Sequence, residues 1–177
     1  MKKLQKEILT IKKIPGMPFL KAVSGTDISN NFPKHIHTDL CIGIIIHGER
    51  LMTINGKDEL LNSNDVFIIN PGEPHICSSP EKKIHSYHII ILESEFILKI
   101  AGDISADKNP FIFDNFIKND MELSLRMTDL IRTLLTSDMF IEKESMLYSF
   151  LEILIKNHSS AKKSISEIKK SSRAVQL

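Results

Sequence analysis

Three histidines in two short motifs are the side chains of this sequence best suited to chemistry. His35 and His37 are two positions apart, and His75 ends the segment NPGEPH at residues 70–75. Side chains at i and i+2 of a strand share a face, so His35 and His37 are expected to point the same way, in phase with Cys41 if no bulge intervenes. Three imidazoles and a thiolate could hold Zn²⁺ tetrahedrally, or another divalent metal such as Ni or Fe. The candidate metal ligands are His35, His37, Cys41 and His75.

The same histidines could instead form the polar wall of a pocket for a small organic effector. A neutral imidazole donates or accepts hydrogen bonds, and this use needs no metal. Strand alternation places His85 and Tyr87 on one face and His88 on the other, so Tyr87 is a further candidate for the pocket wall. Cys41 would then be a small buried apolar residue. Both uses stay open, and the candidate effector contacts are His35, His37, His75 and Tyr87.

Short apolar runs separated by turn residues surround these motifs and predict β-strands. Apolar and β-branched side chains cluster at residues 40–46, 51–54, 66–69 and 87–92. Asn55-Gly56 predicts a tight hairpin, because a type I′ turn needs two residues that tolerate positive φ. Strands that recur with turns at this spacing indicate an antiparallel sandwich or barrel. In such a barrel, His75 would begin a strand that lies opposite the two earlier histidines.

Few charged side chains are expected inside this barrel. Glu49 and Arg50 follow Gly48 in a turn between two apolar runs, where charged groups are normally solvated. An interior with little charge argues against a highly charged effector. Sugars, aromatic compounds and small amides are the candidate ligands.

The pattern changes near residue 119 from strands to two amphipathic helices. Asn119 or Asp120 could cap the first helix, and a break near Ser137-Asp138 separates it from the second. Consecutive helices with a short connection predict an antiparallel hairpin. The apolar stripes are Leu123, Met127, Leu130, Ile131 and Leu134 in the first helix, and Leu147, Phe150, Leu151 and Leu154 in the second.

Composition and charge exclude several broad classes of protein. The 177 residues are 42% apolar, enough for one domain with a helical appendage, and a net charge of +1 gives no support for nucleic-acid binding by this chain. The basic start lacks the apolar region of a signal peptide, and the apolar runs are too short to cross a bilayer. Cys41 and Cys77 cannot build a disulfide framework. We therefore expect a cytoplasmic protein that does not contact a membrane.

Two spaced motifs resemble those of the cupin family of barrels. The pattern G-x9-H-x-H-x3-C-x6-G, which starts at Gly25, is similar to the first cupin motif, and N-x5-N-x-G-x2-H, which starts at Asn64, is similar to the second. The segments FPKHIH, HGE and LNSNDVFIINPGEPH resemble, more narrowly, the ligand-sensing domain of AraC-type transcription regulators, over residues 32–158. This resemblance implies an effector-binding cupin barrel, a helical pair used for dimerisation, and a DNA-binding domain with two helix-turn-helix units.

The sequence departs from the cupin pattern at three positions. Cys41 stands where cupins carry a glutamate, and Asn64 and Asn70 replace a glycine and a proline. Catalytic cupins usually rely on that glutamate as a metal ligand, so the resemblance implies a sensor and not an enzyme. The competing hypothesis is a metal-dependent cupin enzyme, or a metal-binding cupin, that uses the three histidines. A third is a dimerisation module without a ligand.

These inferences combine into a mainly β fold: a cupin-like antiparallel barrel, or double-stranded β-helix, followed by a C-terminal α-helical hairpin. Residues 1–115 would form an N-terminal arm (1 to about 20) and the effector-binding barrel, and residues 116–158 a helical pair for homodimerisation. Residues 159–177 would be a basic linker toward a DNA-binding domain missing from this chain. The predicted function is effector sensing for an AraC-type regulator, with DNA contacted only through that missing domain.

Overall fold

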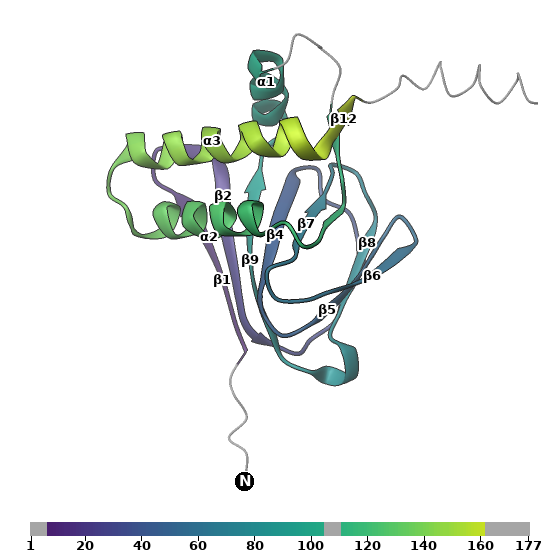
Figure 1. Ribbon diagram of the computed structural model, residues 1–177. Helices are drawn as coiled ribbons and strands as arrows, with labels where there is room; N and C mark the ends of the chain where they lie inside the picture. The colour runs from purple at the N-terminus through teal and green to yellow at the C-terminus, as the bar shows by residue number, and fades with distance from the viewer. Residues whose placement is uncertain (1–6, 105–110, 162–177) are drawn as a thin grey trace, which may run out of the picture.

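Two antiparallel sheets face each other in the barrel of the computed structural model, which describes residues 7–104 and 111–161 (Figure 1). The larger sheet has the strand order β1-β2-β9-β4-β7-β11, and the smaller sheet has the order β3-β8-β5-β6. The larger sheet contains β1 (Ile8–Ile14), β2 (Met17–Ile28), β4 (Leu40–His47), β7 (Val66–Ile69), β9 (His85–Leu92) and β11 (Phe116–Ile117). The smaller sheet contains β3 (Phe32–His35), β5 (Arg50–Ile54), β6 (Lys57–Leu61) and β8 (His75–Ser78). The predicted antiparallel barrel is confirmed.

Three α-helices lie outside the barrel in the described part of the chain: α1 (Ser94–Ile104), α2 (Met121–Thr136) and α3 (Phe140–His158). α2 and α3 lie side by side as an antiparallel hairpin, as predicted (Figure 1). Asp120 caps α2, because its side chain accepts a hydrogen bond from the Leu123 backbone N–H at 2.9 Å. His158 Nε2 lies 2.9 Å from the other oxygen of Asp120, and this contact joins the end of α3 to the start of α2.

The central strands of the larger sheet are buried on both faces. On β4, Cys41 and Ile45 point into the barrel interior, whereas Ile42 and Ile44 pack with the apolar faces of α2 and α3. A strand covered on both faces needs apolar residues at every position, which explains the unbroken apolar run in this part of the sequence. The sheet therefore separates the barrel interior from the helical pair by the thickness of one strand layer.

Two glycines allow aromatic rings to approach the inner face of this sheet. A Cβ atom at Gly43 would lie 2.1 Å from Cζ of Phe67, and one at Gly25 would lie 2.6 Å from the ring of Tyr87. A side chain at either position would overlap the ring, so the close approach requires glycine. The rings of Phe67 and Tyr87 consequently form part of the floor of the barrel interior.

The N-terminal segment differs from the predicted arm. Ile8–Ile14 form β1, which pairs with β2 at the edge of the larger sheet, and β2 pairs with β9. Six of the seven β1 residues are exposed, so this strand lacks the alternation that marks a half-buried strand in a sequence. Residues 1–6 of the predicted arm lie outside the described residues.

The helical part also begins and ends differently from the prediction. β11 pairs with β7, so the barrel continues to Ile117. The start of the predicted linker, Ser159–Ala161, forms β12, which pairs with β10 (Phe111–Phe113), and residues 162–177 lie outside the described residues. α1 corresponds to no element predicted from the sequence. None of the helices among the described residues is long and apolar enough to cross a membrane.

Candidate functional site

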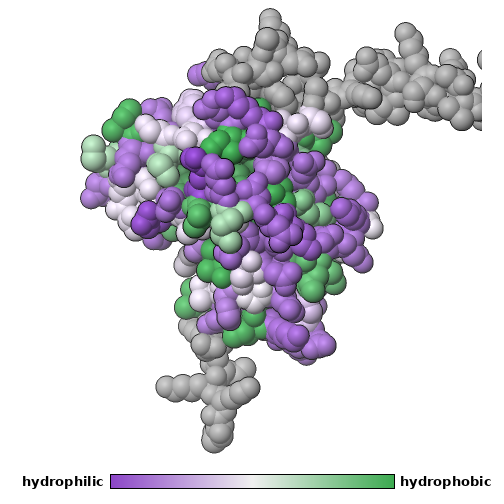
Figure 2. All heavy atoms as spheres, in the orientation of Figure 1, coloured by the Kyte–Doolittle hydropathy of each residue, from purple (hydrophilic) through white to green (hydrophobic). Residues whose placement is uncertain are grey.

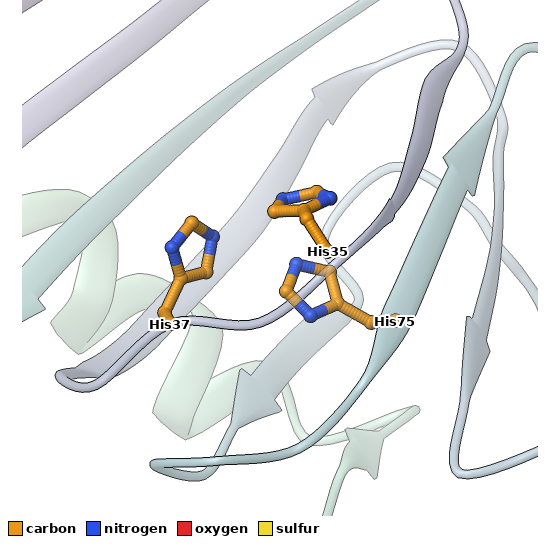
Figure 3. A group of neighbouring side chains, drawn as sticks. All are labelled: His35, His37 and His75. Atoms are coloured by element: carbon orange, nitrogen blue, oxygen red, sulfur yellow. The ribbon is translucent and has the colours of Figure 1, made fainter.

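His35, His37 and His75 meet where β3 ends and β8 begins (Figure 3). His35 and His75 are direct partners in the antiparallel register of these two strands. The ring centroids of His35 and His75 are 4.1 Å apart, and that of His37 lies 4.8 Å from His35 and 5.0 Å from His75. One ring nitrogen of each histidine lies within 4.8 Å of the others. We call these three residues the histidine cluster.

Backbone carbonyls select the tautomer of two cluster members. Nδ1 of His35 lies 2.7 Å from the carbonyl oxygen of Pro33, and Nδ1 of His75 lies 3.1 Å from that of Glu73. A carbonyl oxygen only accepts, so Nδ1 carries the proton and Nε2 keeps its lone pair in the neutral ring. Metal-binding histidines are commonly oriented by this kind of hydrogen bond from the second nitrogen.

Burial favours the neutral form of His37 and His75, two of the three cluster members. Desolvation lowers the pKa of His37, with a further lowering from His35 and an opposing effect of Asp39. Desolvation also lowers the pKa of His75, although its bond to the Glu73 carbonyl opposes this. Metals bind neutral imidazole, so protons compete little at neutral pH.

The donor set of the cluster fits a divalent transition metal. Three tetrahedral nitrogens at about 2.1 Å from Zn²⁺ stand about 3.4 Å apart, so ring nitrogens already within 4.8 Å of one another need only a modest closure. Three nitrogen ligands leave further coordination positions for water or a ligand oxygen. The same neutral rings could also hydrogen-bond an organic molecule directly.

Cys41 is not brought to the histidine cluster. The group of potential ligands within 4.8 Å contains the three histidines and not this thiol. Cys41 is 2% exposed in the barrel interior, and burial raises its pKa to about 12, with smaller contributions from Asp39 and Cys77. A thiol that stays protonated is a poor metal ligand. In this structure Cys41 is a buried apolar contact of the barrel core.

Tyr87 lies in the barrel interior beside two polar residues. Tyr87 and His85 are both buried on β9 with their rings 5.7 Å apart, and His88 points to the other face, as alternation predicts. The guanidinium carbon of Arg50 lies 4.2 Å from the Tyr87 ring centroid. Tyr87 therefore lies on the interior side of the barrel, next to Arg50 and His85.

Arg50 corrects the expectation of a solvated turn and an uncharged interior. It begins β5, is only 4% exposed, and faces the rings of Phe32 and Phe67 as well as Tyr87. Its inward direction follows from alternation with Met52 and Ile54, the other buried residues of β5. That period-two pattern was present in the sequence, but the charge of Arg50 concealed it.

A polar network connects the turn before His75 to the segment that precedes α2. Oε2 of Glu73 accepts hydrogen bonds from the Asn70 backbone N–H at 2.9 Å, from Asn70 Nδ2 at 3.1 Å and from Asn115 Nδ2 at 2.6 Å. Asn70 also exchanges two hydrogen bonds with the backbone of Phe113, at 2.9 and 3.0 Å. Phe113 ends β10, and Asn115 lies between β10 and β11, shortly before α2. We call this set the Asn70 network.

Acid is expected to destabilise the protein through His85. Burial, followed by the charge of Arg50, lowers the pKa of His85 to about 4, while the Lys83 backbone and Glu7 oppose this. An unfolded imidazole titrates near pH 6.5, so between these values only the unfolded state binds the proton. Stability is therefore full above pH 6.5 and falls as the pH drops toward 4, by about 2 kcal/mol at pH 5 for this residue.

Urea unfolding at pH 7.5 and pH 5.0 measures this loss. His37, His75 and His88 also have lowered pKa values, chiefly through burial, so the wild type should lose more than the share of His85. His85→Gln should reduce the loss on acidification by about 2 kcal/mol. Equal losses in the two proteins would contradict this role of His85.

A barrel of two antiparallel sheets with a histidine cluster at one end of a strand pair, followed by a helical pair, defines a cupin-type domain. Residues 21–151 match the family described as the AraC-like ligand binding domain. The chain belongs to this family, which confirms the predicted resemblance.

The chain is also similar to individual proteins. It is 23% identical over 156 residues to a protein of Bacillus subtilis (strain 168) described as the uncharacterized HTH-type transcriptional regulator YbfI, covering 88% of this chain and 56% of the relative. The chain therefore spans about half the length of the curated relative it matches. Among solved structures, a cupin superfamily protein of Desulfitobacterium hafniense is 12% identical, with a TM-score of 0.44 over 51% of this chain and 83% of that protein. The Cupin_2 domain of an XRE family transcriptional regulator from Enterobacter cloacae is 15% identical, with a TM-score of 0.40 over 50% of this chain and 97% of that domain.

Proposed function

We propose that this chain senses a small-molecule effector for an AraC-type transcriptional regulator. The observation that carries the proposal is a cluster of partly buried histidines beside a largely apolar barrel interior, in a member of the AraC-like ligand binding domain family. The effector contacts His35, His37, His75 and Tyr87. DNA binding belongs to a separate helix-turn-helix part of such a regulator, and the proposed role of the chain involves no catalysis.

The Asn70 network supports a route from the effector to the helices. His75 is hydrogen-bonded to the backbone carbonyl of Glu73, so an effector that contacts His75 also affects the turn at residues 70–74. The Glu73 side chain accepts a hydrogen bond from Asn115, which precedes α2. A shift of this turn would move the start of α2, provided that the effector binds the two positions with different affinity. The helical pair then changes the relative placement of the attached DNA-binding units.

The helical pair is the proposed surface for homodimerisation. Exposed apolar side chains lie at the start of α2 and at the connection to α3, and Figure 2 shows apolar atoms on this part of the surface. Large apolar side chains exposed at several positions of one helical pair favour an interaction surface. The residues are Met121, Leu125, Met139, Phe140 and Ile141. Sedimentation velocity of the chain tests this pairing.

A ligand screen tests the effector proposal. Thermal unfolding of the wild type is measured with sugars, aromatic metabolites and small amides, and each stabilising compound is repeated with His37→Ala. We expect the stabilisation to be lost in this variant, because a ligand at free concentration L that binds only the folded state stabilises it by RT ln(1 + L/Kd), which vanishes when binding is lost. His47→Ala is the matched control, since His47 is an exposed histidine at the end of β4. Equal stabilisation of all three proteins would place the ligand away from the cluster and contradict the proposal.

A second candidate function is binding of a divalent transition metal by the histidine cluster. The specific observation that favours it is the pair of Nδ1–carbonyl hydrogen bonds, which leave Nε2 of His35 and His75 available as ligands. The described group lacks a carboxylate, so it differs from a catalytic set of histidines with a glutamate. A bound Zn, Ni or Fe ion would supply a Lewis-acidic position for an effector oxygen.

A further inference from the structure

The barrel interior contains a group of buried polar atoms that have no hydrogen-bond partner. Among the described residues, the buried side-chain atoms in this state are Nε and Nη1 of Arg50 and Nε2 of His85. Both residues border the ring of Tyr87, so the unpartnered atoms come from one region. Arg50 is 4% and His85 1% exposed. Native proteins rarely leave buried polar groups unsatisfied, so this region requires an explanation.

The guanidinium of Arg50 also lacks a counter-ion. Glu49, the adjacent residue, lies 3.7 Å from Lys83 on the outside, and Glu7 hydrogen-bonds to Ser29 and Asn30. Within residues 7–104 and 111–161, Arg50 takes part in no ion pair. Three aromatic rings at 4.2 to 6.0 Å stabilise the cation in part. A buried charge without an ionic partner is unfavourable for the empty protein, and an anion would relieve it.

We propose that Arg50 and His85 form an anion-binding subsite in the barrel interior, and that it receives the carboxylate of a small apolar organic acid. This inference rests on the proposed effector-sensing function and names the chemical class of the effector. The planar guanidinium fork matches the two oxygens of a carboxylate. Nδ1 of His85 is bonded to the hydroxyl of Ser79 at 3.2 Å, which leaves Nε2 available for the ligand.

Charge and surroundings select a carboxylate over a phosphate group. A single guanidinium beside a histidine held neutral by burial balances one negative charge, whereas a phosphate monoester carries nearly two at neutral pH. The side chains around Arg50 are the rings of Phe32, Phe67 and Tyr87 with apolar neighbours such as Met52, and such surroundings suit an apolar ligand body. Phe32 is the partly exposed member of these rings and lies on edge strand β3, so the ligand enters beside it.

The test compares carboxylates with matched neutral amides. Benzoate and hexanoate are titrated into the chain beside benzamide, hexanamide and inorganic phosphate, with thermal unfolding and calorimetry as readouts. We expect the carboxylates to raise the Tm of the wild type and the amides and phosphate to leave it unchanged. Arg50→Met should weaken carboxylate binding at least 100-fold. Arg126→Met is the matched control, because Arg126 is an exposed arginine on α2 and should bind as the wild type does.

The ligand-free variant separates a binding arginine from a structural one. Arg50→Met removes an unpaired buried charge and keeps most of the side-chain volume, so its Tm without ligand should equal or exceed that of the wild type. A large fall in the Tm of Arg50→Met would show that Arg50 stabilises the folded barrel, and this result would overturn the inference.

The wild-type titrations decide the question even if this variant does not fold. Equal stabilisation by carboxylates and amides would overturn the anion subsite but leave effector binding in the barrel intact. Stabilisation by phosphate alone, or by none of these compounds, would also overturn the inference. The screen with His37→Ala tests the effector-sensing function separately, because its outcome depends on the histidine cluster and not on Arg50.

Discussion

Replacing Asn70 with alanine is expected to lower the free energy of unfolding by about 3 kcal/mol. The Asn70 side chain is buried and bonds both the N–H and the carbonyl of Phe113, at 2.9 and 3.0 Å. Alanine would leave these two backbone groups without partners, and each unsatisfied buried group costs about 1–3 kcal/mol. The substitution would also remove the hydrogen bond that Asn70 Nδ2 donates to Glu73. Urea unfolding at pH 7.5 measures the change.

Two further variants define the origin of this loss. Asn157→Ala, at an exposed asparagine of α3, should change stability by less than about 0.5 kcal/mol. Asn70→Asp keeps the oxygen that accepts from Phe113 N–H but places a second oxygen against the Phe113 carbonyl and Glu73, so it should be no more stable than Asn70→Ala. A stability of Asn70→Ala within the range of Asn157→Ala would show that the network does not hold the 113–115 segment.

Features that depend on local chemistry were predictable from the sequence. Asn55 and Gly56 have φ values of 52° and 80° in the hairpin between β5 and β6, as a type I′ turn requires. The stripe of α2 and its Asp120 cap are also local patterns, because they depend on residues a few positions apart. The pairing of His35 with His75 followed from the turn before His75, which makes β8 start at that residue.

Features that depend on the path of the chain were not predictable in the same way. Cys41 shares strand parity with His35 only if the strand continues, but the chain leaves β3 in the smaller sheet and enters β4 in the larger one. The two residues therefore do not belong to one face. β1 was not predicted because it is exposed on both faces. Its sequence therefore lacks the apolar alternation that would indicate its pairing with β2.

The inward direction of Arg50 was not predicted from the sequence, because two local signals disagree at this position. Composition favours the solvated position, because arginine is rarely buried without a partner. Alternation along β5 favours the interior, and the structure follows alternation. A site that binds an anion needs such a conflict between local preference and position, since a cation with its own counter-ion would be unavailable to a ligand.

Substitution of His75 by alanine is expected to lower the affinity for Zn²⁺ on the order of 100-fold or more, if the histidine cluster binds metal as the second candidate function requires. His75 is the buried member of the cluster, and its tautomer is set by the Glu73 carbonyl at 3.1 Å. Without His75, the remaining ligands are His35 and His37, which are not paired across two strands. Competition with a chromophoric chelator measures the affinity, and elemental analysis of protein purified without added metal measures occupancy.

His47→Ala provides the control for this measurement, because it removes an exposed imidazole from the end of β4 and leaves the cluster unchanged. We expect one equivalent of Zn²⁺ in the wild type and in this control, and none at the same free concentration in His75→Ala. Unchanged affinity in His75→Ala would assign the metal to other residues. A wild type that stays folded and metal-free in micromolar Zn²⁺ would exclude metal binding at this strength. The three imidazoles would then serve as direct hydrogen-bonding contacts for an organic effector, because each imidazole can donate or accept a hydrogen bond and the three rings lie close together.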